Sequence, residues 1–89
     1  MNASEESAKI LIIEDDPILA RSIYQGLADD GYECKLCSSG SEAVQLTQSE
    51  QFHVAMLDLG LEDESGLGVL RCIRESNEAT SVIVLTPIE

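Results

Sequence analysis

The sequence of 89 residues allows one small domain and excludes large doubly wound enzymes, TIM barrels and two-domain architectures. Seventeen acidic residues against five basic ones give a formal net charge of -12. This balance excludes the basic surface that binding to bare nucleic acid or to an anionic membrane requires. The polar N-terminus and three cysteines without a secretion signal favour the reducing cytoplasm.

The first part of the chain predicts a tail, a strand and a helix. Residues 1–8 are polar and are expected to form a flexible N-terminal tail. Residues 9–13 are a continuous aliphatic run, which is typical of a central parallel strand covered on both faces. Asp16 followed by Pro17 predicts the start of a helix, and Gly31 predicts its end.

The rest of the chain repeats this alternation. The expected elements are, in order, a strand over Tyr32–Cys37, a helix after residues 38–41, a strand over His53–Asp58, an acidic loop over Leu59–Ser65, a helix over about Gly66–Ser76 with Leu67, Leu70 and Ile73 on its inner side, and a strand over Ser81–Thr86. The order βαβαβαβ predicts one α/β domain over residues 9–89. Its sheet is expected to be parallel, with right-handed crossovers and helices on both faces.

Polar groups follow three of the four predicted strands. Glu14 and Asp15 follow the first strand, Asp58 ends the third and Thr86 ends the fourth. In a parallel sheet these groups converge on one edge, where ligands bind. Neighbouring carboxylates repel one another, and a hard cation such as Mg²⁺ relieves the repulsion.

Such an edge is suited to phosphoryl transfer. A carboxylate that the metal leaves partly free is a nucleophile toward phosphorus, while the metal and a nearby hydroxyl neutralise the developing charge. The alternative for each group alone is structural, since acids stabilise helix N-termini and a single aspartate often ends a strand as a turn residue. The coincidence at three strand ends favours the chemical interpretation.

At these positions the sequence resembles the receiver domain of two-component response regulators. The matching residues are Ile10–Pro17, Leu57–Leu61, Gly66 and Val82–Thr86. The sequence of Leu57–Leu61 is most similar to that of the class that carries a C-terminal winged-helix DNA-binding domain and regulates transcription in bacteria. The resemblance implies a flavodoxin-like (CheY-like) fold.

Carried over residue by residue, the resemblance implies that Asp58 accepts a phosphoryl group from a sensor histidine kinase. It implies Mg²⁺ bound by Glu14, Asp15, Asp58 and the carbonyl group of Gly60, with Thr86 as the switch hydroxyl. A receiver of this kind is a signalling switch that catalyses only its own phosphorylation and dephosphorylation, and not a turnover enzyme.

The sequence also departs from the family pattern. The family fold has a fifth strand, which carries a lysine, and two further helices, whereas this sequence ends after the fourth strand. Pro87 lacks the N–H group that the family directs at the phosphoryl group, and Glu62 stands where the family has proline. An alternative is therefore a truncated receiver, incompetent in phosphotransfer, that acts as an assembly unit or is a fragment. A small magnesium-dependent phosphatase is a weaker third possibility.

The truncation predicts a partner. In the family order Val82–Leu85 would form an uncovered, apolar edge strand, and such edges pair with other chains. We therefore expect a homodimer or a strand-exchanged assembly through the fourth strand, and no nucleic-acid or membrane partner for this segment. Cys34 and Cys37 are spaced C-x-x-C, but on a strand they point to opposite faces and do not form a metal-binding pair.

Overall fold

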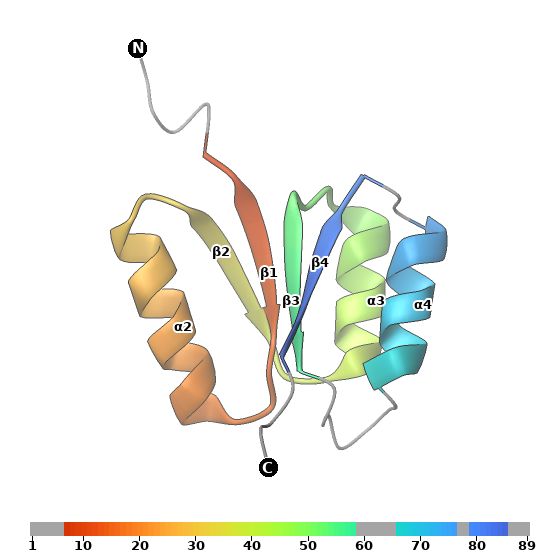
Figure 1. Cartoon of the computed structure of the whole chain (residues 1–89), viewed down its shortest axis with the longest axis horizontal. Coiled ribbons are helices and arrows are strands. Elements are labelled where there is room, and N and C mark those ends of the chain that lie inside the picture. The colour runs from red at the N-terminus through yellow and green to blue at the C-terminus, as the bar shows by residue number, and fades with distance from the viewer. Residues whose placement is uncertain (1–6, 59–65, 77–78, 86–89) are drawn as a thin grey trace.

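The structure of the chain, a computed structural model, describes residues 7–58, 66–76 and 79–85. The elements are β1 (Lys9–Ile13), α2 (Pro17–Asp29), β2 (Glu33–Cys37), α3 (Gly40–Ser49), β3 (Val54–Asp58), α4 (Gly66–Ser76) and β4 (Ser81–Leu85). The strands form one parallel sheet in the order β2-β1-β3-β4, with α2 on one face and α3 and α4 on the other (Figure 1). This confirms the expected α/β fold.

Helix α2 begins and ends where the sequence predicts. The Asp16 side chain accepts hydrogen bonds from the N–H groups of Ile18 and Leu19, at 3.0 and 3.3 Å. Pro17 is the first helical residue, where its missing N–H costs nothing. After the helix, Gly31 has a φ of 95°, a left-handed conformation that glycine adopts readily. Capping at both ends therefore fixes the path of the chain from β1 to β2.

The main hydrophobic core lies between the sheet and the pair α3 and α4. Its buried members are Leu11, Ile13, Cys37, Ala43, Phe52, Ala55, Leu57, Val69 and Ile73. One expectation about α4 was wrong: Leu67 is 62% exposed, and Val69 occupies the core instead. Two residues rotate a helix by about 200°, so Leu67 and Val69 point in nearly opposite directions.

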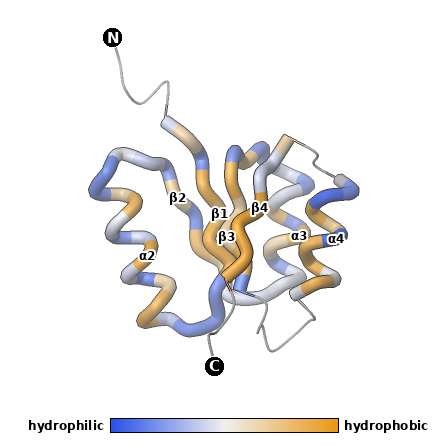
Figure 2. The backbone as a smooth tube through the Cα atoms, in the orientation of Figure 1, coloured by the Kyte–Doolittle hydropathy of each residue, from blue (hydrophilic) through white to orange (hydrophobic). Residues whose placement is uncertain are grey.

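The opposite face of the sheet is only half covered by helix. Helix α2 packs on β1 and β2. The strand register places Ile12, Met56 and Ile83 in one row across β1, β3 and β4. Ile12 is fully buried, whereas Ile83 is 49% exposed, and the hydrophobic colouring continues along the central strands (Figure 2). Among the residues that the structure describes, no helix covers β4 on this face.

Hydrogen bonds tie the start of the described chain to the sheet. The Ser7 hydroxyl donates to the Gly31 carbonyl oxygen, and the N–H of Glu33 donates to the Ala8 carbonyl oxygen, each at 3.0 Å. Ser7 and Ala8 lie within the N-terminal segment that we expected to be a tail, and both are hydrogen-bonded to the region around β2. Residues 1–6 lie outside the described part of the chain.

The two lysines of the sequence share one acidic partner. Lys9 Nζ and Lys35 Nζ each lie 2.6 Å from a carboxylate oxygen of Glu50. Hydrogen bonds from both ammonium groups lower the pKa of Glu50, and the bond to Glu50 raises the pKa of Lys9. Lys9 Nζ also lies 5.2 Å from the centroid of the Phe52 ring, within cation–π range. These contacts link β1 and β2 to the segment that precedes β3.

Thr80 offers a test of the contact between β4 and the chain before β3. Thr80 is fully buried, and its hydroxyl donates to the Phe52 carbonyl oxygen at 2.7 Å. Thr80→Val removes the donor while keeping the shape, and leaves the acceptor buried without this partner. We expect the free energy of unfolding in urea to fall by about 1–3 kcal/mol. Thr80→Ser keeps the donor and is expected to lose less, so equal losses would contradict the role of the hydrogen bond.

Candidate functional site

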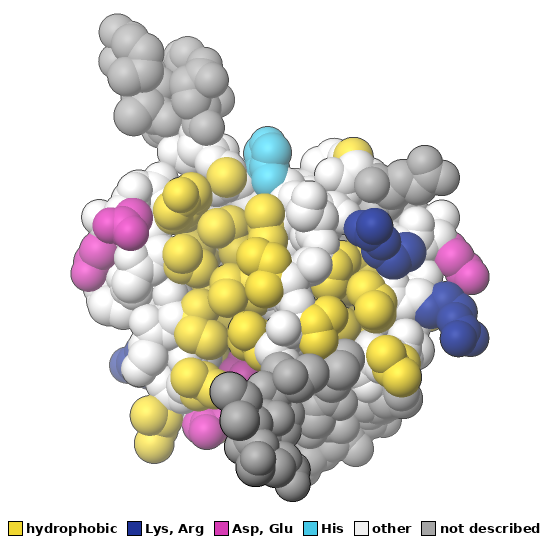
Figure 3. Space-filling view, viewed as in Figure 1, with side chains coloured by type: hydrophobic (Ala, Val, Ile, Leu, Met, Phe, Trp, Pro, Cys, Tyr) yellow, Lys and Arg dark blue, Asp and Glu magenta, His cyan; other side chains and the backbone are white. Residues whose placement is uncertain are grey.

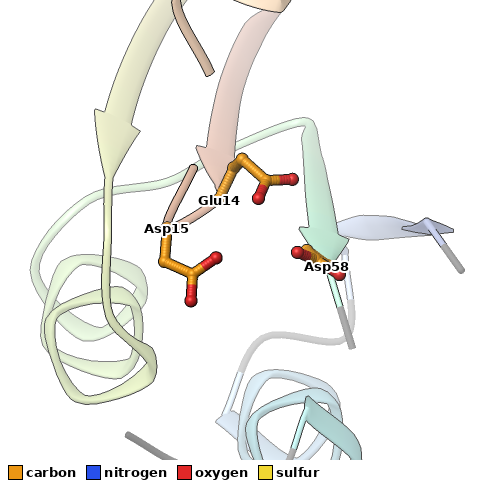
Figure 4. Close-up of side chains that lie close together, drawn as sticks. All are labelled: Glu14, Asp15 and Asp58. Carbon is orange, nitrogen blue, oxygen red and sulfur yellow. The ribbon is translucent and has the colours of Figure 1, made fainter. Parts of the chain in front are cut away.

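The parallel register brings the acidic residues together. Ile13 of β1 pairs with Leu57 of β3, so the residues that follow each of them, Glu14 and Asp58, emerge side by side at the same edge of the sheet. Carboxylate oxygens of Glu14, Asp15 and Asp58 all lie within 4.8 Å of one another (Figure 4). The convergence that the strand ends predicted for these three acids is present in the structure.

Glu14 is the most constrained member of this acidic cluster. It is only 3% exposed, whereas Asp15 and Asp58 are half-buried. Its N–H donates to the Cys37 carbonyl oxygen at 3.1 Å, and its Oε2 accepts from the Asp16 N–H at 3.1 Å. Within the described residues, its Oε1 is buried without a hydrogen-bond partner. Buried polar atoms of this kind are rare, and a proton, a water molecule or a cation would satisfy this one.

The electrostatics of the acidic cluster also favour binding of a cation. Burial raises the pKa of Glu14 to about 7, and the neighbouring Asp58 and Asp15 carboxylates add to the rise. The hydrogen bond from the Asp16 N–H opposes it. Each of the raising effects disfavours a third negative charge at this edge. A bound cation would remove the penalty without protonation.

The geometry of the acidic cluster fits a small divalent cation. Oxygen ligands bind Mg²⁺ at about 2.1 Å, so two ligands on opposite sides of the ion lie about 4.2 Å apart. The three carboxylates, whose oxygens lie within 4.8 Å of one another, are therefore close to a coordinating arrangement. The donor set also fits, because Mg²⁺ prefers carboxylate and carbonyl oxygens. The orphaned Oε1 of Glu14 distinguishes this site from an ordinary group of surface acids.

Two of the predicted site residues lie outside the described part of the chain. These are Gly60, expected as a carbonyl ligand, and Thr86, expected as the switch hydroxyl. The departures at Glu62 and Pro87 fall in the same undescribed segments. The described site therefore consists of Glu14, Asp15 and Asp58, and the sequence predicted all three.

A groove beside the acidic cluster was not predicted. It has a volume of about 530 Å³ and is lined by Glu14, Asp15, Pro17, Ala20, Arg21, Leu36, Cys37, Ser38 and Glu42. Arg21 contributes the basic group in this lining. It follows Pro17 by four residues, and residues at this spacing share one face of a helix. From the sequence, this spacing could have placed Arg21 on the same helix face as Pro17, next to the acidic residues that follow the first strand.

One family model matches nearly the whole of the chain. The model of the response regulator receiver domain matches residues 10–89. The chain belongs to the response regulator receiver family. The transcriptional regulatory protein PmrA of Pectobacterium parmentieri is 37% identical to this receiver over 78 residues, which are 88% of this chain and 35% of the relative. The chain thus spans about a third of the length of such curated relatives.

Solved receiver structures share the fold. The receiver domain protein of Methanospirillum hungatei has a TM-score of 0.90 and 26% identity, over 93% of this chain and 66% of its own. TrrA of Thermotoga maritima, in complex with Mg²⁺ and BeF, has a TM-score of 0.86 and 28% identity, over 92% of this chain and 71% of its own. TrrA also appears in complex with the histidine kinase ThkA, with a TM-score of 0.84 and the same identity and coverage.

These findings confirm the CheY-like receiver fold and the two-component family that the resemblance implied. Receiver domains are signalling switches, they bind Mg²⁺ at an acidic pocket, and they interact with histidine kinases. In the parts of the chain that the structure describes, every helix is too short or too polar to cross a membrane.

Proposed function

We propose that this chain is the phosphoacceptor module of a two-component phosphorelay, in which Asp58 accepts a phosphoryl group from a histidine kinase. The observation that carries this proposal is the acidic cluster at the carboxyl edge of the sheet, in a chain of the receiver family. Asp58 is the member suited to attack, since it is half-buried and comes from the strand opposite Glu14 and Asp15. Glu14 is buried and has one oxygen held by a backbone N–H.

The residues of the acidic cluster have separate roles in this proposal. Glu14, Asp15 and Asp58 would hold Mg²⁺, with the Gly60 carbonyl as a further ligand. When bound, the ion supplies the positive charge that offsets the charge on the phosphoryl oxygens. An oxygen of Asp58 forms the bond to phosphorus while the phosphorus–nitrogen bond of the phosphohistidine breaks, and the donor imidazole keeps that electron pair. The hydroxyl of Thr86 then turns toward the new phosphoryl group.

The output and the cellular location of the receiver are proposed by analogy with its relatives. Transcriptional regulators such as PmrA match this chain over a third of their length, so we propose that the phosphorylated receiver controls transcription in the bacterial cytoplasm. In this role the domain works as a switch, and it carries out its own phosphorylation and dephosphorylation without turning over a separate substrate.

Mass spectrometry tests the proposal directly. The chain is incubated with acetyl phosphate, with Mg²⁺ or with EDTA, and its intact mass is measured before and after treatment with hydroxylamine. We expect a gain of one phosphoryl group that requires Mg²⁺ and is removed by hydroxylamine, as for an acyl phosphate. A chain that stays unmodified in Mg²⁺ would overturn phosphoacceptance and favour the phosphotransfer-incompetent alternative.

The start of α2 is the proposed contact for the kinase. Ile18 is 79% exposed, and it lies between Asp16 and the groove residue Arg21. A large apolar side chain beside a reactive site is typical of a protein interface. We expect Ile18→Ser to slow phosphoryl transfer from a kinase about tenfold, which corresponds to about 1.4 kcal/mol, and to leave labelling by acetyl phosphate unchanged.

The kinase for this measurement is the one that labels the native chain fastest among a set of purified histidine kinases. Leu67→Ser is the matched control, because Leu67 is 62% exposed and lies on α4. If Ile18→Ser and Leu67→Ser slowed the transfer equally, α2 would not be the preferred contact.

We also propose that the 89-residue chain self-associates through β4, as a homodimer or a strand-exchanged assembly. The observation that supports this second role is the exposure of the β4 side chains Ile83 and Val84, at 49% and 38%. Sedimentation velocity over a range of protein concentrations tests it. A monomer at all concentrations would overturn this role and leave phosphoacceptance untouched.

A further inference from the structure

We propose that Arg21 attracts small anionic phosphodonors, such as acyl phosphates, to the reactive edge of the sheet and so influences which donors label Asp58. This inference rests on the phosphoacceptance proposed above and adds a residue that determines donor specificity. Arg21 acts while the donor approaches, and it takes no part in the change of bonds.

The groove that Arg21 lines opens onto the acidic cluster. Glu14 and Asp15 belong both to the lining of the groove and to the cluster. Asp58, the third member of the cluster, has a carboxylate oxygen within 4.8 Å of an oxygen from each of them. The groove has a volume of about 530 Å³, which is ample for a molecule the size of acetyl phosphate. A donor in this groove is therefore close to the carboxylate that we propose as the nucleophile.

An anionic donor is repelled by most of this molecule. The chain has a net charge of -12, and Glu42 adds a further acidic side chain to the groove. Bound Mg²⁺ offsets charge at the acidic cluster, but its two positive charges face three carboxyl groups. A positive side chain on the wall of the groove opposes this repulsion and raises the local concentration of the donor.

The charge of Arg21 is available for this purpose. Arg21 is exposed, and in the part of the chain that the structure describes, the ion pairs are those of Glu50 with Lys9 and with Lys35. The guanidinium group is therefore not neutralised by an acidic residue of the described groove. A donor anion can use its charge without first breaking an ion pair.

The other basic residues are committed or lie elsewhere. Lys9 and Lys35 are bound to Glu50, whereas Arg71 and Arg74 lie on α4, on the face of the sheet opposite α2. Figure 3 shows basic side chains over α4, and acidic side chains near the lower end of the view, where Figure 1 places the carboxyl ends of the strands. Of the five basic residues in the sequence, Arg21 is the one that lines the groove beside the acidic cluster.

Donors of different charge test the proposal. At neutral pH acetyl phosphate is mainly a dianion, whereas phosphoramidate is a monoanion because its nitrogen is protonated. An oxygen of Asp58 forms the bond to phosphorus with either donor, and acetate or ammonia leaves with the electron pair of the broken bond. Intact-mass analysis measures the labelling rate in Mg²⁺ at low ionic strength. A range of donor concentrations separates the maximal rate from the concentration that gives half of it.

Arg21→Glu is expected to lower the ratio of the maximal rate to the half-saturating concentration about tenfold for acetyl phosphate and about threefold for phosphoramidate. In water, one pair of unit charges about 10 Å apart changes a local concentration about twofold, and this factor multiplies with the charge of the donor. The loss should disappear at about 1 M salt, where the Debye length is about 3 Å. Arg21→Lys keeps the charge and should retain most of the native rate.

Two further variants control for net charge and for folding. Arg71→Glu makes the same change in net charge at an exposed position of α4 and should be labelled at the native rate. Glu42→Gln removes an acidic group from the groove and should be labelled about twofold faster by acetyl phosphate, a gain that unfolding cannot produce. Circular dichroism confirms that every variant is folded.

The outcomes separate this inference from the proposed function. If Arg21→Glu were labelled at the native rate, lost the same factor with both donors, or were slowed no more than Arg71→Glu, Arg21 would have no role in attracting the donor. Each of these results would leave phosphoacceptance by Asp58 standing. A native chain that neither donor labels would overturn both proposals.

Discussion

Asp58→Asn is expected to reduce labelling by acetyl phosphate to background, while the native chain gains one phosphoryl group in the presence of Mg²⁺. An amide oxygen is a poor nucleophile compared with a carboxylate, and the substitution also removes one of the three carboxyl groups of the acidic cluster. The far-ultraviolet circular dichroism should remain native, because the amide is nearly the same size as the carboxylate. Intact-mass analysis followed by peptide mapping provides the measurement.

Asp16→Asn is the matched control for this experiment. Asp16 is exposed and lies beside the acidic cluster in sequence, where it caps α2. Asparagine caps helices as well as aspartate does, so this variant should keep both its fold and its labelling. If Asp58→Asn were labelled as fast as the native chain, the acceptor would be a different residue.

Glu14→Gln is expected to stabilise the metal-free chain above pH 7. The pKa of Glu14 in the folded chain is about 7, against an ordinary value of 4.5. Between these values the folded state keeps a proton that the unfolded state has lost, so the free energy of unfolding of the native chain falls as the pH rises. The full difference corresponds to about 3 kcal/mol. Glutamine carries no charge, and the variant should lack this fall.

Urea unfolding in EDTA at pH 5, 6, 7 and 8 measures the effect, with Glu42→Gln as a control at an exposed groove position. Adding Mg²⁺ should reverse the order at pH 8, because the ion stabilises the native chain and binds the Glu14→Gln variant more weakly. Protons compete with the ion, so its stabilising effect should decline below pH 7. A native stability that does not change between pH 5 and 8 in EDTA would show that Glu14 ionises as an ordinary carboxyl group.

Much of the fold could be predicted because local signals and topology agreed. Asp16 and Pro17 define the start of α2, and the aliphatic run before them defines β1. The alternation of strands and helices then required a parallel sheet, and a parallel sheet places all strand ends at one edge. The meeting of Glu14 and Asp58, which are 44 residues apart, follows from this rule and needed no contact information.

Other features depend on packing and could not be predicted. The sequence places Glu14 and Asp15 next to each other, yet only Glu14 is buried with an oxygen that lacks a partner. That difference arises from how β1 sits between β2 and β3. Leu67 and Val69 are similarly apolar, and only the rotation of α4 against the sheet decides which one is buried. The groove beside Arg21 also exists only once α2, β2 and α3 are packed together.

The register of β1 against β3 couples the reactivity of Asp58 to correct folding of the central strands. Side chains alternate between the two faces of a strand, so a slip of one residue would move Leu57 out of the core and turn Asp58 into it. A misaligned chain would therefore lose its nucleophile and its hydrophobic core in the same step. Molecules that can be labelled at Asp58 are thus expected to be those whose central strands are aligned natively, and the labelled fraction becomes a count of correctly folded chains.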